Sequence, residues 1–117
     1  MPKKSTKQKV LTLCPDDGSP WGLWCGNPPS PAHQGGHLAP EHFYLSKSLT
    51  KRLEAWLELW RENYADAPEE ESHTWKRGFD QYWWVQEGDA ISASLEEEVH
   101  GYVVDRRYRT YLASPTR

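Results

Sequence analysis

The stretch from Leu49 to Tyr64 restricts the possible folds more than any other part of this sequence. Apolar side chains recur there at spacings of four, three, four and four residues, on Leu49, Leu53, Trp56, Trp60 and Tyr64, and Leu57 widens the stripe. The opposite face is charged, with Lys51, Arg52, Glu54, Glu58, Arg61 and Glu62. This periodicity predicts an amphipathic helix that is capped by Ser46 or Ser48 and ends near Ala65. Its apolar face needs a second layer of structure to cover it.

A second helix is predicted to begin around Phe79–Asp80 and to run to about His100, with Gly101 as its left-handed terminator. Its apolar stripe consists of Trp84, Gly88, Ile91, Leu95 and Val99. Glycine in a helix interior costs about 1 kcal/mol relative to alanine. Its presence on the apolar face therefore indicates that the two helices approach each other closely.

Three short apolar runs flank the helices and are typical of strands: Val10–Leu13, Trp21–Cys25 and Tyr102–Val104. The residues after the last run, 105–108, are expected to lead out of the fold. This element order predicts an α+β fold. A small sheet of two to three strands, including both terminal strands, packs against an antiparallel pair of helices.

A chain of 117 residues has room for one domain. We expect a flexible basic tail at 1–9, one α+β domain at 10–108 with a Pro/Gly-rich loop at 26–40, and a C-terminal tail at 109–117. Every apolar run is far shorter than the ~20 residues that a membrane helix needs. No signal-peptide-like segment follows the basic N-terminus. The expected location is therefore cytoplasmic, without a membrane partner.

Large aromatic side chains are unusually frequent, with seven Trp and six Tyr against two Phe and one Met. Each buries a large area, so a few of them can build the core of a short chain. We expect roughly two-thirds of them in the core. The remainder would be available to a binding surface, where Trp and Tyr are enriched.

The cysteines and histidines supply the candidate metal ligands and nucleophiles of this chain. Cys14, Cys25, His33 and His37 are the ligand types of a tetrahedral zinc site. The two cysteines, however, lie farther apart than the Cys pairs of structural zinc sites, and two cysteines do not make a disulfide framework in a cytoplasmic chain. We expect no cofactor, and a zinc-binding accessory protein stays an alternative.

No catalytic arrangement stands out. A thiolate–imidazolium pair would have to come from Cys14, Cys25, His33, His37 and His42. No activating feature follows either cysteine. Asp16–Asp17 lies in a turn cluster, where Asp is favoured for its geometry, and consecutive acids at Glu96–Glu98 point in different directions on a helix. The sequence therefore predicts a protein that is not an enzyme.

Charge is distributed unevenly along the chain, whose net charge is -3. Residues 66–98 carry ten acids against Lys76 and Arg77, whereas the two ends are basic through Lys3, Lys4, Lys7, Lys9, Arg106, Arg107 and Arg109. The basic ends suit a nucleic-acid-associated regulator, the main alternative. Neither predicted helix has a basic face, which disfavours a nucleic-acid partner. The acidic middle suits a basic protein partner, because complementary charge speeds encounter and selects the partner.

Aromatic residues outside the core stripe lie between these acids, a composition suited to a binding hot spot. The predicted contact set is Glu69, Glu70, Glu71, Trp75, Tyr82, Trp83, Glu87, Asp89, Glu96 and Glu97. In this interpretation the acids of 66–71, 87–89 and 96–98 imitate a polyanionic substrate. The three aromatic residues anchor the contact.

A family resemblance covers roughly residues 45–105. The pattern Leu45-Ser46-x-x-Leu49-x-x-x-Leu53-x-x-Trp56-x-x-x-Trp60, followed by Trp84-x-x-x-Gly88-x-x-x-x-x-x-Leu95-x-x-Glu98 and a terminal strand, resembles a group of small bacterial α+β proteins of mostly uncharacterised function. The long Pro/Gly/His loop departs from that group. In size and acidity the chain is similar to immunity proteins of polymorphic and contact-dependent toxin systems. The resemblance implies an inhibitor that neutralises a basic toxin domain, such as a nuclease, by occluding its active surface.

Overall fold

The computed structural model describes residues 9–16, 20–25, 38–65 and 74–113 of the chain. Its elements are β1 (Lys9–Leu13), β2 (Leu23–Cys25), the 3-10 helix η2 (Pro40–Phe43), α1 (Lys47–Trp60), the π-helical turn η3 (Arg61–Ala65), α2 (Gln81–Glu98), β3 (Tyr102–Asp105) and the 3-10 helix η5 (Arg107–Ala113). The predicted α+β fold is confirmed. None of the helices in these ranges is long and apolar enough to cross a bilayer.

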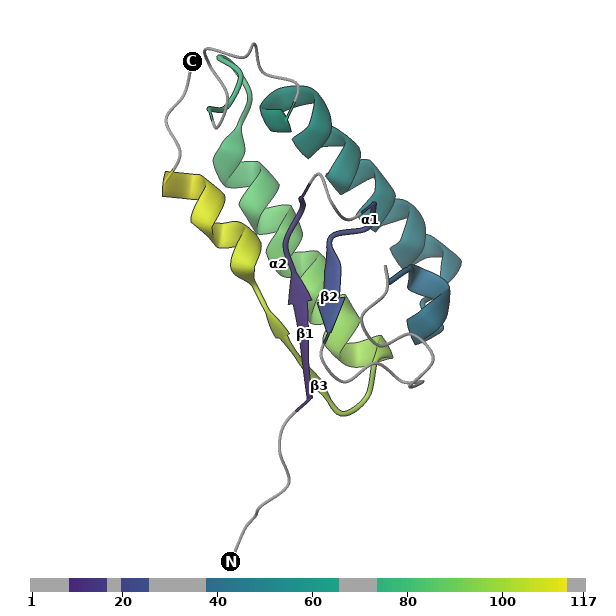
Figure 1. Cartoon of the computed structure of the whole chain (residues 1–117). Coiled ribbons are helices and arrows are strands. Elements are labelled where there is room, and N and C mark those ends of the chain that lie inside the picture. The colour runs from purple at the N-terminus through teal and green to yellow at the C-terminus, as the bar shows by residue number, and fades with distance from the viewer. Residues whose placement is uncertain (1–8, 17–19, 26–37, 66–73, 114–117) are drawn as a thin grey trace, which may run out of the picture.

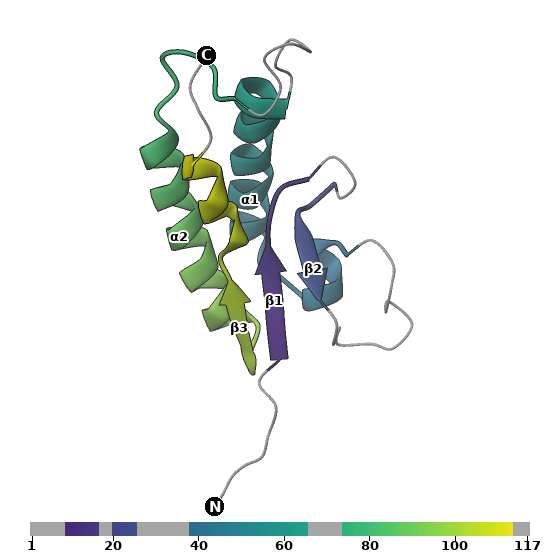
Figure 2. The same ribbon diagram turned by 60° about the vertical axis from the view of Figure 1, so that its left-hand side comes forward.

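The three strands form one mixed sheet in the order β2-β1-β3. β1 pairs antiparallel with β2, and Thr12 lies opposite Trp24. β1 pairs parallel with β3, so that Val10 lies opposite Val103. A parallel neighbour requires a long crossover connection, which here contains both helices. Figures 1 and 2 show α1 and α2 running in opposite directions along one face of this sheet.

Both helices begin at side-chain caps. The Ser46 hydroxyl accepts a hydrogen bond from the Leu49 N–H at 3.2 Å, and an Asp80 carboxylate oxygen accepts one from the Trp83 N–H at 2.9 Å. Each bond satisfies a backbone donor that has no partner within its own helix. Helical structure after α1 continues through the π-helical turn to Ala65. Beyond α2, Gly101 has a φ of +88°, a left-handed conformation that glycine adopts without strain.

The interface between the helices centres on two stacked tryptophans. The rings of Trp56 and Trp84 lie 4.4 Å apart at an interplanar angle of 7°. Each indole N–H donates to the backbone carbonyl of the other residue, at 2.8 and 3.1 Å. A Cβ atom at Gly88 would lie 2.8 Å from Cζ2 of Trp56 and 2.6 Å from Cε2 of Tyr108. The close approach predicted at Gly88 is therefore present, and η5 takes part in it.

The C-terminal segment differs from the expectation. Residues 105–108 were predicted to lead out of the fold, yet Tyr108 is fully buried. Its ring packs edge-on against both Trp56 and Trp84. Tyr111 follows one turn later and contacts Trp60, so η5 closes one side of the core and residues 109–113 are not a tail. Figure 2 shows η5 continuing from β3 alongside α2.

Most of the aromatic side chains lie in the core. Eight of the fifteen are buried: Phe43, Trp56, Trp60, Tyr64, Trp75, Trp84, Tyr102 and Tyr108. Trp21, Phe79 and Tyr111 pack against that cluster and are partly buried. Trp24, Tyr44, Tyr82 and Trp83 are exposed. Because exposed tryptophan is the exception in this chain, the surfaces that carry it are the candidates for binding.

Candidate binding surfaces

The two cysteines do not share a site. Cys25 lies opposite Leu11, whose side chain faces the helices. Cys14 directly follows β1, three residues after Leu11. Successive side chains of a strand alternate between its faces, so the two thiols lie on opposite faces of the sheet. Among the described residues, no three His, Cys, Asp or Glu side chains group together as metal ligands would. His33 and His37 lie outside the described residues.

The candidate nucleophile pairs gain no support from the described geometry. Burial raises the pKa of the Cys14 thiol above its usual value, so the thiol stays protonated at neutral pH. The His42 ring is used locally, because its Nδ1 accepts the Ala39 N–H at 3.1 Å. A protonated thiol is a poor nucleophile, and Cys14 therefore has the chemistry of a small, partly buried polar group.

Three of the four described acids that were predicted to contact a partner have partners inside the chain. Glu87 forms a two-point ion pair with Arg52 of α1, at 2.6 and 2.8 Å. Glu96 accepts the backbone N–H of Val104 in β3 at 2.9 Å. Only Glu97 of the described acids in that set is exposed. Glu69, Glu70 and Glu71 lie outside the described residues.

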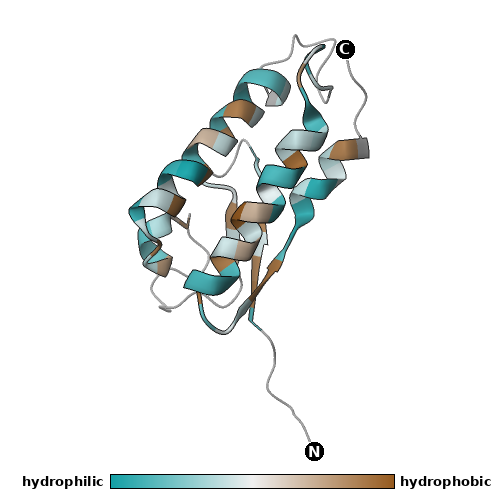
Figure 3. Cartoon of the chain, turned by 180° about the vertical axis from the view of Figure 1, so that it is seen from behind, coloured by the Kyte–Doolittle hydropathy of each residue, from teal (hydrophilic) through white to brown (hydrophobic). Residues whose placement is uncertain are grey.

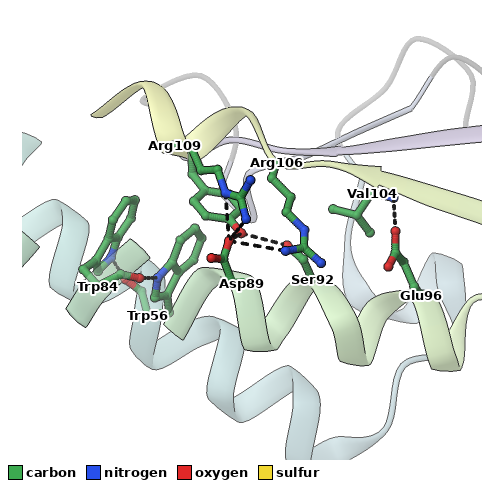
Figure 4. A network of polar contacts seen from close by, with 9 residues as sticks. Trp56, Trp84, Asp89, Ser92, Glu96, Val104, Arg106 and Arg109 are labelled. Atoms are coloured by element: carbon green, nitrogen blue, oxygen red, sulfur yellow. Dashed lines mark hydrogen bonds and ion pairs between the residues drawn. The ribbon is translucent and has the colours of Figure 1, made fainter. Parts of the chain in front are cut away.

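Asp89 is the centre of a polar network that joins α2 to η5, shown in Figure 4. One of its oxygens accepts the Tyr108 hydroxyl at 2.5 Å and the Arg109 Nε at 3.0 Å, and Arg106 lies 3.6 Å away. The Ser92 hydroxyl lies 3.2 Å from the Tyr108 oxygen. Burial, followed by the hydrogen bond to the Asp89 carboxylate, raises the pKa of Tyr108. The tyrosine therefore remains a donor, and the network joins η5 to α2.

The same contacts bear on the basic C-terminal residues. Arg106 and Arg109 pair with Asp89, and Arg107 pairs with Asp105 at 3.0 Å. Lys9 lies over the Tyr102 ring, 5.5 Å from its centroid, and Lys3, Lys4 and Lys7 lie outside the described residues. The arginines that the sequence offered to phosphates thus already face carboxylates of this chain. This arrangement weakens the nucleic-acid alternative.

The expected role of Trp75 as a surface anchor is wrong. Its side chain is fully buried, and its indole N–H donates to the Tyr111 carbonyl at 2.9 Å. The ring stacks on Phe79 at a centroid distance of 5.2 Å and meets Tyr64 edge-on. Trp75 lies outside the regular part of α2, so its position relative to the helix stripe carried no information about burial. Its contacts with Tyr64 of η3 and Tyr111 of η5 place it in the core.

Tyr82 and Trp83, in contrast, lie on the outside of α2. Their side chains are 66% and 47% exposed, although the next residue, Trp84, is completely buried. The face that they share with later turns of the helix is named here the α2 outer face. It consists of Tyr82, Trp83, Gln86, Ala90, Ala93 and Glu97. Over about 22 Å of helix it carries two aromatic rings, two small residues and a single charge. Figure 3 views the two helices from this side.

A second exposed apolar surface was not singled out from the sequence. Val10, Trp24 and Val103 are 42%, 41% and 39% exposed. The strand register places them on the face of the sheet that points away from the helices. The alternation of buried Leu11 and Leu13 with their neighbours was the signal that could have indicated this face. The pairing of the three strands, which brings the exposed residues together, is not readable from short runs.

Tyr44 is exposed and has an unusual backbone conformation. Its φ of 56° is the only positive value on a non-glycine residue in the described chain, and its side chain is 87% exposed. The residue ends η2, and its N–H bonds back to the carbonyl of Glu41 at 3.3 Å. The left-handed conformation costs free energy for a tyrosine, but the tight turn into α1 requires it. The sequence carried no signal for this position.

Comparison with known protein families, with curated proteins and with solved structures gave no match for this chain.

Proposed function

We propose that this protein is a non-catalytic binding module, an inhibitor of the immunity-protein type that neutralises a basic toxin domain, such as a nuclease, in the cytoplasm. The observation that carries the proposal is the pair of exposed rings at the start of α2. Tyr82 and Trp83 are 66% and 47% exposed in a chain that otherwise buries or partly buries most of its aromatic side chains. Exposed Trp and Tyr are the residue types that dominate binding energy when a partner buries them.

The support extends along the α2 outer face. After the two rings, Ala90 and Ala93 leave the backbone of the helix accessible, so a partner can approach closely. Glu97 lies at the far end and is exposed. This order of anchor, flat surface and acid suits a partner whose own surface has an apolar pocket beside basic residues.

The acids that support the proposal are not the ones in the contact set predicted from the sequence. Glu87, Asp89 and Glu96 have partners within the chain and are not available to imitate a polyanion at full strength. Glu54 and Glu58 of α1 and Glu62 of η3 are exposed, one per turn, and add to the negative field. Together with the net charge of -3, they favour encounter with a basic protein, whereas the aromatic pair supplies most of the affinity.

The experiment that tests this proposal uses a basic protein encoded beside the gene as a purified binding partner. Isothermal titration calorimetry would measure its affinity for the native chain and for Tyr82→Ala/Trp83→Ala. We expect a stoichiometric complex whose Kd rises at least about 30-fold in the double variant, in line with two hot-spot side chains. Glu58→Gln on α1 is the matched control and should change Kd less than about twofold.

Two results would contradict the proposal. One is a complex whose affinity is unchanged by removal of both rings, because the α2 outer face would then not be the contact. The other is recovery of nucleic acid with the purified protein and no binding to the neighbouring basic protein. That second result would favour the regulator that uses the basic ends of the chain.

A further inference from the structure

The face of the sheet turned away from the helices carries a second set of exposed side chains. The register places Val10 beside Val103 and Thr12 between Trp24 and Asp105. We name this surface the open sheet face; it consists of Val10, Thr12, Cys14, Trp24, Val103 and Asp105. Because it points away from the helices, it lies on the other side of the molecule from the α2 outer face (Figure 2).

One end of the open sheet face is hollowed. A pocket of about 330 Å³ is lined by Thr12, Cys14, Asp16, Trp24 and Arg107. The indole N–H of Trp24 donates to the Cys14 carbonyl at 2.9 Å, which holds the ring against β1 and leaves it 41% exposed. The pocket therefore has a fixed aromatic wall before any ligand arrives.

The charges around the pocket favour a cation. Arg107 binds Asp105 through Nη2 at 3.0 Å, and the Thr12 hydroxyl donates to the same carboxylate oxygen at 3.5 Å. Asp16 adds a second carboxylate. Burial raises the pKa of the Cys14 thiol, which is therefore neutral at physiological pH. Asp105 lies beside the lining residues Thr12 and Arg107, and with it the region around the pocket holds two carboxylates and one guanidinium, a net charge of minus one.

We propose that this pocket binds the guanidinium group of an arginine side chain presented by a partner polypeptide. The flat guanidinium stacks on the Trp24 ring. This attraction is stronger for a guanidinium than for an ammonium group, because the guanidinium is more weakly hydrated. Its N–H groups reach the carboxylates of Asp16 and Asp105, whose charge strengthens the hydrogen bonds. Val10 and Val103 form an apolar shelf beside the pocket for the residue next to that arginine.

This inference goes beyond the proposed function and does not depend on it. The inhibitor proposal rests on Tyr82 and Trp83 on the α2 outer face, whereas the arginine pocket uses neither residue. Each can therefore fail alone. A partner that contacts both surfaces would have to reach around the molecule, so we assign the two surfaces to separate contacts.

The experiment is a titration of the 15N-labelled full chain, followed by 1H–15N correlation spectra. The probe is N-acetyl-arginine amide, and its neutral isostere N-acetyl-citrulline amide is the matched control. The indole N–H peak of Trp24 is assigned from the spectrum of Trp24→Phe. We expect a saturable shift of this peak and of the Thr12 and Asp105 amide peaks with the arginine probe. A single side chain should bind with a Kd of order millimolar.

Variants locate the binding. Asp16→Asn changes an exposed side chain and should raise the Kd about fivefold. Trp24→Leu should abolish the shifts of the neighbouring amides. Asp105→Asn removes the other carboxylate, and the dispersion of its spectrum shows whether that variant is folded. Tyr82→Ala on the α2 outer face should leave the Kd unchanged.

Three results would overturn the inference. The citrulline probe could shift the same peaks as far as the arginine probe, which would exclude recognition of the charge. N-acetyl-lysine amide could bind as tightly, which would exclude selection of the guanidinium. The same peaks could move with protein concentration in the absence of any probe, which would mean that a second copy of the chain occupies the open sheet face.

Discussion

The two helices have similar inner faces and different outer faces. Both α1 and α2 bury an apolar stripe, and their stacked indoles, Trp56 and Trp84, contribute equally to the interface between them. The exposed side of α1 carries a charge in nearly every turn, at Lys47, Lys51, Glu54 and Glu58, and Glu62 of η3 continues the row. The α2 outer face carries two aromatic rings, two alanines and one charge. A stripe of apolar residues thus identifies the buried side of a helix, and the composition of the other side indicates whether it meets water or a partner.

The largest expected effect separates the two faces of α2 at neighbouring residues. Trp84→Ala removes a fully buried indole, and such a truncation should lower the free energy of unfolding by about 3–5 kcal/mol. Trp83→Ala removes a half-exposed ring and should change it by about 0.5 kcal/mol. Urea denaturation followed by circular dichroism measures both values. Equal losses in the two variants would mean that the α2 outer face is also covered in the folded protein.

The next effect tests the close contact of α2 with α1 and η5. Gly88→Ala adds a Cβ atom that would lie within 3 Å of the rings of Trp56 and Tyr108. Overpacking of this kind should cost about 1–3 kcal/mol, although alanine is the better helix former by about 1 kcal/mol. The matched change on the outer face is Ala93→Gly, which should cost about 1 kcal/mol from helix propensity alone. A stabilised Gly88→Ala variant would show that η5 does not pack on α2 in solution.

High pH should weaken the contact between η5 and α2 that Tyr108 makes with Asp89. The pKa of Tyr108 is raised in the folded protein, so the folded state holds this proton more tightly than the unfolded state does. The stabilisation from this proton is fully present below about pH 10, the pKa of tyrosine in the unfolded chain, and is lost as the pH rises above that value. Tyr108 should contribute a slope of up to about 1.4 kcal/mol per pH unit.

Tyr108→Phe provides the control for that titration. Burial also raises the pKa values of Tyr111 and Tyr102, so these tyrosines too should contribute to the loss of stability of the native chain above pH ~10. The phenylalanine variant keeps the ring but has no phenolic proton, and the pH dependence of its stability should be less steep. An unchanged slope in the variant would exclude Tyr108 as a source of the loss. The midpoints of urea denaturation, measured for the native chain and for Tyr108→Phe across this pH range, give the two slopes.

The smallest expected effect is on the outer side of α1. Glu58 makes an exposed ion pair with Arg61 at 3.4 Å, and pairs of this kind are worth less than about 0.5 kcal/mol. Glu58→Gln should therefore leave the free energy of unfolding almost unchanged. A loss above about 1 kcal/mol would show that the charged side of α1 has a structural role. The outer faces of α1 and α2 would then differ less.

Local patterns in the sequence predicted a large part of the fold. The stripe from Leu49 to Tyr64 indicated the first helix, and Gly88 indicated the close contact between the helices. Both follow from the helical period and from the chemistry of one residue, which depend only on neighbours in the chain. The parallel pairing of β1 with β3 and the return of η5 onto the core depend on contacts between distant segments, which no local pattern encodes.

The candidate surfaces were less predictable than the fold. Trp75 was expected on the surface because it lies outside the helix stripe, but it is buried by residues from η3 and η5. Glu96 was expected to meet a partner, but it caps a backbone N–H of β3. A charge pattern shows where acids occur in the chain. Whether they face solvent depends on which donors the folded chain brings to them.

By itself the sequence determined the two amphipathic helices, a serine cap at the start of the first, the short strands and the glycine contact, because each depends on side chains a few residues apart. Only the tertiary structure decided which charges are available and which aromatic residues are exposed. Asp89 meets Tyr108 and two arginines, and Trp24 joins Val10 and Val103 on one face of the sheet. These groups come from segments far apart in the chain, and their burial and pairing exist only once the segments have packed.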